Sequence, residues 1–210
     1  MLTRRQLLSF SLRTLFAAVA LSGGACWLVR RRWLRTQHQA FIVQEVERLG
    51  GVVGYAHEWD DVADRGTGLP IPGSAIMRRI LGDHFFLTPT LVMFDESSVS
   101  TDDLPPIEEL KGIMTVDFSS CPNIGDDVID VVAQMPNLQV VCFYGTPVSF
   151  DALQRLKCLP NLKTLHVPHT RLNRSSADRL SYDFGGDIVS WNDDTYISTS
   201  AIVATLQDGG

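Results

Sequence analysis

The sequence predicts an α/β fold in which short parallel strands and helical returns stack as a solenoid behind an N-terminal transmembrane helix. Two observations predict the solenoid and a third predicts the helix. From residue 89 to about residue 194 an apolar pattern recurs every 24 or 25 residues. Within each repeat the third and fifth positions are apolar, as side chains that point from a strand into a core should be. Residues 14–29 carry no charge, which predicts an apolar helix.

Charge is distributed unevenly along the 210 residues. The first 35 residues contain seven arginines and no acidic residue, so the other 175 contain 11 basic and 24 acidic side chains, a formal net charge of −13. A body with this excess of carboxylates repels phosphate backbones, and we therefore expect no binding to nucleic acid.

Four cysteines are present, and their spacing favours neither a disulfide framework nor a zinc site. None of them forms a CxxC pair, and one lies in the apolar N-terminal segment: Cys26, Cys121, Cys142 and Cys158. We expect no metal and no cofactor, and the redox state of the thiols stays open.

The first 33 residues are interpreted as a short tail, residues 1–13, followed by a transmembrane signal anchor, residues 14–33. Extending the apolar run back to Leu7 across Arg13 gives about 20 residues, which is the length needed to cross a bilayer. A cleaved signal peptide, a lipoprotein site at Cys26 and a twin-arginine export signal are alternatives. Trp27 and Trp33 suit a membrane interface, which favours an uncleaved single-pass anchor of undecided orientation.

Residues 34–88 are predicted to form an N-terminal cap of helix, strand, loop and helix. An apolar stripe at helical spacing predicts a helix over residues 34–49, and Gly50 and Gly51 end it. A strand is expected at residues 52–55 and a loop at residues 57–73. Ser74 is the expected N-cap of a helix over residues 75–81, which Gly82 stops.

The predicted loop contains a cluster of potential metal ligands: His57, Glu58, Asp60, Asp61 and Asp64. Calcium loops place their ligands at alternate positions with a glycine at the tight turn. This run does not match that spacing, so we interpret it as a solvated acidic loop.

Residues 89–210 are predicted to form about five repeats. The inward strand positions are Val92, Val116, Val141, Leu165 and Val189 at position three, and Phe94, Phe118, Phe143, Val167 and Trp191 at position five. Each return segment adds further apolar residues, and acidic or hydroxyl-bearing residues open the returns as helix starts do. Because no single coil can bury its own apolar face, stacking of the coils must supply the core.

At this level of detail the chain resembles bacterial membrane-anchored leucine-rich repeat proteins, whose repeats read LxxLxLxxTxVTDxxLxxLxxLPN. The best match is residues 138–161, LQVVCFYGTPVSFDALQRLKCLPN. The resemblance implies a leucine-rich repeat solenoid with parallel strands on the concave side and helical returns on the convex side. It also implies binding or scaffolding without catalytic residues.

The outward strand positions predict a mixed polar surface on the concave side. Position four of the successive repeats reads Met93, Asp117, Cys142, His166 and Ser190. We expect a protein partner to contact this surface through Asp117, Ser119, Cys142, Tyr144, His166, His169 and Asn192. The same row places a thiol beside an imidazole, the pair that cysteine hydrolases use, and it invites a metal site at Cys142, His166 and His169. His166 has no evident orienting group except His169, and no oxyanion donor is evident.

The sequence therefore predicts a membrane-tethered leucine-rich repeat protein that acts as a protein–protein interaction or scaffolding module and is not an enzyme. Its expected partners are an unidentified protein on the concave surface and the membrane through residues 14–33. A thiol hydrolase that uses Cys142 and His166, or a structural protein of envelope assembly, is the alternative.

Overall fold

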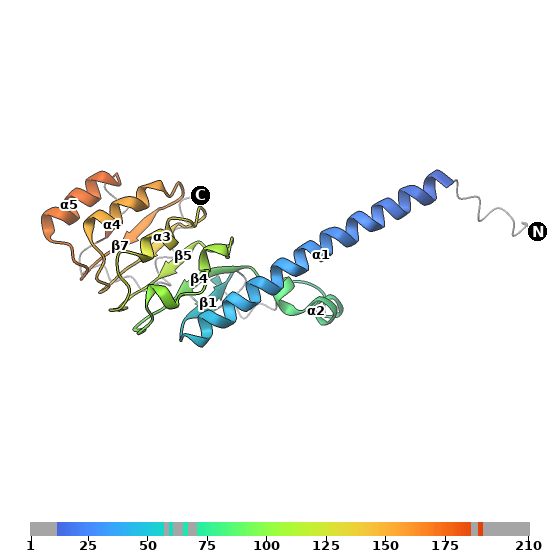
Figure 1. The fold of residues 1–210 in the computed structure, drawn as a ribbon, viewed down its shortest axis with the longest axis horizontal. Coiled ribbons are helices and arrows are strands. Elements are labelled where there is room, and N and C mark those ends of the chain that lie inside the picture. Colours follow the sequence, from blue (N-terminus) through green and yellow to red (C-terminus); the bar gives the residue numbers. More distant parts are fainter. Residues whose placement is uncertain (1–11, 57–58, 61–64, 67–70, 186–188, 191–210) are drawn as a thin grey trace, which may run out of the picture.

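The computed structural model describes residues 12–56, 59–60, 65–66, 71–185 and 189–190. Its centre is a six-stranded sheet in the order β1-β4-β5-β6-β7-β8 (Figure 1). These strands are β1 (Val52–Tyr55), β4 (Pro89–Met93), β5 (Thr115–Asp117), β6 (Val140–Cys142), β7 (Thr164–His166) and β8 (Val189–Ser190). β1 pairs antiparallel with β4, and the other four pairings are parallel. A separate antiparallel pair joins β2 (Trp59–Asp60) to β3 (Arg65–Gly66).

The register of the parallel strands is the one that the 24-residue spacing predicts. Val92 pairs with Val116, Val116 with Val141, Val141 with Leu165, and Leu165 with Val189. All five side chains are buried. A shift of one residue would turn every apolar side chain to the other face, so burial of the whole column fixes the register.

Short helices return the chain to the next strand and cover one face of the sheet. They are α3 (Val128–Val132), α4 (Phe150–Gln154) with η4 (Arg155–Cys158), and α5 (Arg174–Asp183), which lie side by side in Figure 1. The first return contains only the 3-10 turns η2 (Thr101–Asp103) and η3 (Ile107–Glu109). Pro105 and Pro106 explain the difference, because proline has no N–H to donate and cannot continue a helix.

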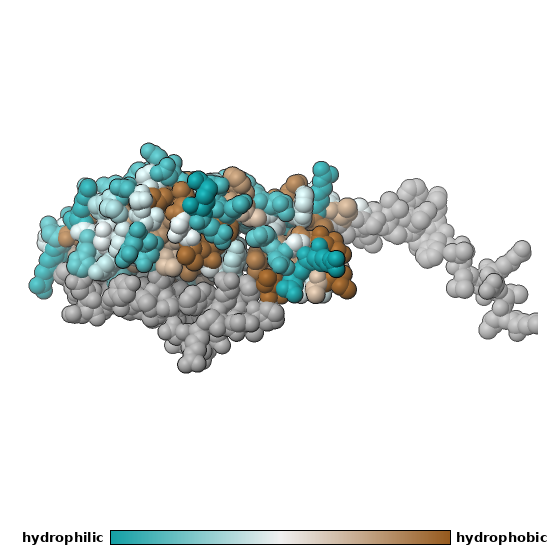
Figure 2. All heavy atoms as spheres, turned by 90° about the horizontal axis from the view of Figure 1, so that it is seen from below, coloured by the Kyte–Doolittle hydropathy of each residue, from teal (hydrophilic) through white to brown (hydrophobic). Residues whose placement is uncertain are grey.

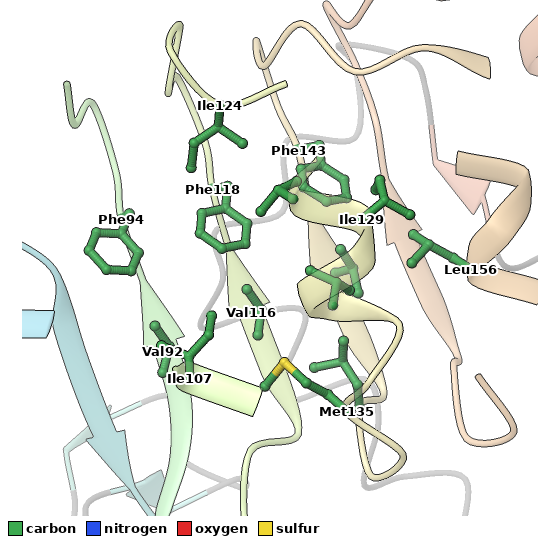
Figure 3. Close-up of a cluster of buried hydrophobic side chains, with 14 of the residues drawn as sticks. Val92, Phe94, Ile107, Val116, Phe118, Ile124, Ile129, Met135, Phe143 and Leu156 are labelled. Carbon is green, nitrogen blue, oxygen red and sulfur yellow. The ribbon is translucent and has the colours of Figure 1, made fainter. Parts of the chain in front are cut away.

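The core lies between the sheet and these returns. Three phenylalanines that follow successive strands, Phe94, Phe118 and Phe143, stack in a row with 5.9 Å between neighbouring ring centroids (Figure 3). All three are fully buried. Each of these rings is thus buried partly against the ring that follows the neighbouring strand.

A single helix, α1 (Leu12–Arg48), precedes the sheet. Its C-terminal part buries Ile42 and Val46 in the core. It ends where predicted, at Gly50, whose φ of 83° is a left-handed conformation that glycine adopts without strain. At Gly51 an added Cβ would lie 2.7 Å from the ring of Phe94, so the helix end and the core pack closely there.

The predicted transmembrane helix is wrong. Within the described residues, α1 included, no helix combines the length and the apolar character needed to cross a membrane. The uncharged run of residues 14–29 spans about 24 Å as a helix, short of the roughly 30 Å hydrocarbon core. This finding overturns the signal anchor, the single-pass membrane localisation and the predicted fold class of a solenoid behind a transmembrane helix. The α/β part of that class agrees with the structure.

The second predicted helix is confirmed. α2 (Ala75–Leu81) begins after Ser74, whose hydroxyl accepts a hydrogen bond from the backbone N–H of Met77. Gly82 ends it with a φ of 85°, and the turn η1 (Asp83–Phe85) follows. The helix buries none of its residues, and Figure 2 shows hydrophobic residues gathered on the surface in this region.

Candidate binding site at the strand ends

The polar column predicted from the sequence exists as a ladder of strand partners. Met93 pairs with Asp117, Asp117 with Cys142, Cys142 with His166, and His166 with Ser190. The three central side chains were predicted to be an open contact surface, yet Asp117 and Cys142 are 3% exposed and His166 is 2% exposed. They are therefore part of the interior and do not present themselves to a partner.

Hydrogen bonds connect this buried column. Asp117 Oδ1 accepts hydrogen bonds from the backbone N–H of Ser119 at 2.8 Å and from the Ser119 hydroxyl at 2.5 Å. The same hydroxyl lies 3.2 Å from Cys142 Sγ. Of the predicted contact residues, Asp117, Ser119 and Cys142 thus form one buried network that links two neighbouring strands.

The environment of Cys142 disfavours a thiolate. Burial raises the pKa of the Cys142 thiol to about 12, and the negative charge of Asp117 adds to the rise. At neutral pH the sulfur is therefore a protonated thiol, whereas the nucleophile of a cysteine hydrolase is a thiolate.

His166 is held neutral in the same column. Burial lowers the pKa of its imidazole below the usual 6.5, and the charge of Asp117 opposes this only in part. Its Nε2 atom is buried and has no hydrogen-bond partner among the residues that the structure describes. Buried polar atoms are almost always hydrogen-bonded. A buried nitrogen without a partner lowers the stability of the folded state, and other interactions in the fold must offset this loss.

An aromatic cluster connects this buried column to the surface. The ring of Tyr144 stacks on His166 and meets His169 edge-on, with ring centroids 6.2 Å and 5.1 Å apart. His166 is buried, Tyr144 is half-buried and His169 is exposed. Asn192, the last predicted contact residue, lies outside the described residues.

Beyond β4, β5, β6 and β7, one residue after each strand adopts the same left-handed backbone conformation. These residues are Glu96, Ser120, Gly145 and His169, with φ values of 49°, 54°, 65° and 54°; we call them the strand-end row. Hydrogen bonds continue the ladder into this row, from Glu96 N to Ser119 O, from Ser120 N to Tyr144 O and from Gly145 N to Pro168 O. The sequence signalled this turn only through Gly145, because three of its four residues are not glycine.

A buried threonine that the sequence analysis did not single out holds one of these turns. Thr146 is fully buried, its hydroxyl donates a hydrogen bond to the carbonyl of Phe118, and it accepts one from the N–H of Cys121. Backbone strain at non-glycine residues persists only where the surroundings enforce it, and Thr146 supplies part of that enforcement.

The strand-end row differs in charge between its two ends. Asp95 and Glu96 are exposed at the β4 end, and His169 is exposed at the β7 end. Partial desolvation raises the pKa of the Asp95 carboxyl, and the negative charges of Asp117 and Glu96 raise it further.

The metal site considered at Cys142, His166 and His169 is not supported by the described residues. In the part of the chain that the structure describes, no group of three or more His, Cys, Asp or Glu side chains is placed to hold a metal ion. That part includes Cys142, His166 and His169. Residues 57–58 and 61–64 of the acidic loop fall outside it.

Comparisons with known proteins identify no relative of the chain. No protein-family model matches the chain, and no curated protein does either. The resemblance to leucine-rich repeat proteins therefore stays a prediction from the sequence.

Proposed function

We propose that the chain is a non-catalytic protein-interaction module whose partner lies along the strand-end row and contacts Tyr144. The observation that carries the proposal is the position of the half-buried ring of Tyr144. The ring contacts both His166 and His169, next to the strand-end row. The proposal differs from the sequence-based one, because it places the contact surface at the ends of the strands and not on the buried column.

The fixed ring favours Tyr144 as an anchor for binding. Tyrosine is enriched among the residues that contribute most to interfaces, since it offers a large apolar surface and a polar hydroxyl. Two ring contacts already restrict its side chain, so less conformational entropy is lost when a partner binds. Carboxylates at Asp95 and Glu96 favour a partner with a basic group facing the β4 end.

The buried column does not support the alternative thiol hydrolase. A substrate would have to reach Cys142 and His166, which are almost fully buried, and the thiol would have to ionise with a pKa of about 12. We therefore assign the column a structural role, in which Asp117, Ser119 and Cys142 join two strands below the strand-end row.

Replacement of Tyr144 tests the proposal. A partner is captured with the full chain from an extract of the source cells, and its affinity is then measured for the wild type, Tyr144→Ala and Tyr182→Ala. Tyr182 is a matched control, because it is 85% exposed and lies on α5, within the returns. We expect Tyr144→Ala to weaken binding by about 2 kcal/mol, roughly 30-fold in Kd, and Tyr182→Ala to leave it unchanged. Equal affinities for the two variants would contradict the proposal.

A further inference from the structure

A second candidate site, which shares no residue with the strand-end row, lies where α1 passes the start of β4. A pocket of about 640 Å³ opens there, and the described residues that line it include four basic side chains and no acidic one. Arg31, Arg32 and Arg35 come from α1, and Lys111 comes from the segment before β5. The spacing of three and four residues places Leu28, Arg32 and Arg35 on the same side of the helix.

These four cations have no carboxylate partner within the described residues. The guanidinium groups of Arg31 and Arg32 lie over the rings of Trp27 and Phe85, at 5.2 Å and 5.0 Å, contacts that orient a cation without neutralising it. Lys111 Nζ donates a hydrogen bond to the backbone carbonyl of Glu108, which leaves its charge in place.

The carboxylate closest in sequence to Lys111 is already engaged. Glu109 Oε2 lies 2.7 Å from His38 Nε2, on the neighbouring turn of α1. The pocket thus concentrates positive charge, whereas residues 36–210 as a whole are acidic, with 24 acidic and 11 basic side chains. Like charges gathered without partners repel one another, and a bound anion would relieve that repulsion.

The position of Lys111, the fourth cation, depends on the neighbouring Gly112. At Gly112 an added Cβ would lie 2.5 Å from the carbonyl oxygen of Pro89 and 2.7 Å from Thr88 Cγ2. Any larger residue would push this segment away from the start of β4, and Lys111 would move with it. The absence of a side chain at Gly112 therefore keeps Lys111 opposite the arginines of α1.

The rest of the lining is mixed, with Thr36, Gln39 and Thr88 as its polar side chains and three larger apolar ones. Leu28, Phe85 and Leu87 face the same space as the four cations. Next to η1, the short helix α2 leaves Ile76, Met77 and Ile80 exposed at 72%, 50% and 68%, in the region where Figure 2 shows hydrophobic surface. An anion alone would contact only the cations, whereas an anion attached to an apolar body would also contact the apolar side chains.

We propose that this pocket binds a phosphate group carried on an apolar moiety. Arginine suits this chemistry because its planar guanidinium offers paired N–H donors to phosphate oxygens, and Lys111 adds a point charge. A small organic phosphate and an anionic lipid headgroup share this chemistry. The site is independent of the strand-end row, so either assignment can fail without the other.

Two probes distinguish the two sources, each measured with the full chain: hexyl phosphate in solution, and phosphatidylglycerol in phosphatidylcholine vesicles. The pocket variant is Arg35→Gln/Lys111→Gln. The matched control is Arg171→Gln/Arg174→Gln, which removes the same number of charges from exposed positions outside the pocket. We expect the pocket variant to bind at least about tenfold more weakly than the wild type and the control to bind as the wild type does.

Selective loss of hexyl phosphate binding assigns a small organic phosphate, and selective loss of vesicle binding assigns a lipid headgroup. Binding of neither probe by the wild type would overturn the proposal. So would an equal loss in both double variants, because that would indicate attraction to net charge alone. Arg31→Gln/Lys111→Gln serves as a second pocket variant, and the thermal unfolding of every variant is recorded so that a folding defect is not mistaken for lost binding.

Discussion

The ring of Tyr144 lies parallel to the imidazole of His166, with 6.2 Å between the ring centroids and 11° between the ring planes. This contact joins the half-buried residue proposed to anchor a partner to a buried member of the polar column. The position of Tyr144 therefore depends on a residue of the buried column. Substitutions in the column are expected to alter binding indirectly, through the orientation of Tyr144.

The buried valine column gives the first prediction. Val141→Asp places a carboxylate at a fully buried strand position, with Val116 and Leu165 as its strand neighbours. Burying an unpaired charge costs several kcal/mol, so we expect the variant to lose its cooperative unfolding transition, measured by circular dichroism. Val52→Asp is the control, because Val52 is exposed on β1 and should change stability little. A cooperative transition for Val141→Asp near that of the wild type would contradict the register.

The four cysteines provide a second prediction. Cys26 and Cys158 are exposed, whereas Cys121 and Cys142 are buried. Burial raises the pKa of Cys121 to about 11 and that of Cys142 to about 12. The thiolate fraction at neutral pH falls about tenfold for each unit of pKa, so a thiol reagent should modify two cysteines quickly and two at least about 100-fold more slowly.

A chromogenic disulfide reagent measures these rates, and unfolding in urea exposes all four thiols as the reference. Cys26→Ser/Cys158→Ser removes the fast phase and isolates the two buried thiols. Fast modification of Cys142 in that variant, slowed again by adding His166→Ala, would favour the thiol hydrolase over the interaction module.

A helix cap gives the third prediction. Ser149 precedes α4, and its hydroxyl accepts a hydrogen bond from the N–H of Ala152 and donates one to Asp126 of the preceding coil. Ser149→Ala should reduce the free energy of unfolding by about 1 kcal/mol or slightly more, since it removes both contacts. Chemical denaturation measures the loss, and Ser175→Ala, at an exposed position in α5, is the comparison. A smaller loss for Ser149→Ala than for Ser175→Ala would argue against the cap.

Periodicity predicts the parallel register because it depends on side chains of a single chemical kind. Val116, Val141 and Leu165 are apolar at equal spacing, and a strand must turn all of them to the same side. The ends of α2 were predictable for a similar reason, since a serine cap and a glycine stop are local signals. The antiparallel pairing of β1 with β4 carries no such signal, because it joins segments about 40 residues apart in the sequence.

Burial of the polar column could not be predicted from the sequence. Asp117 and His166 are residues that usually remain in water, so the alternation along each strand places them on an open surface. The left-handed turns at Glu96, Ser120 and His169 were also beyond prediction, since only glycine signals that conformation reliably. The transmembrane prediction failed because an uncharged run of 16 residues was counted together with its flanks.

The last prediction concerns pH and follows from the burial of His166. Burial holds the pKa of the folded imidazole below 6.5, the value taken as usual for the side chain, although the charge of Asp117 acts in the opposite direction. Just below pH 6.5 the unfolded chain therefore binds a proton at this residue that the folded chain does not bind. The free energy of unfolding must fall as the pH falls through this window, and above it His166 contributes no pH dependence.

His166→Gln should flatten the pH dependence of stability between pH 7.5 and pH 5.5, a range in which carboxylates with ordinary pKa values near 4 remain ionised. Urea denaturation at each pH gives the free energy of unfolding. His169→Gln is the matched control, because His169 occupies the same coil and contacts the same tyrosine but is exposed. If the His166→Gln profile were as steep as that of the wild type, the proton would enter the folded imidazole freely, and the neutral, buried state assigned to His166 would be wrong.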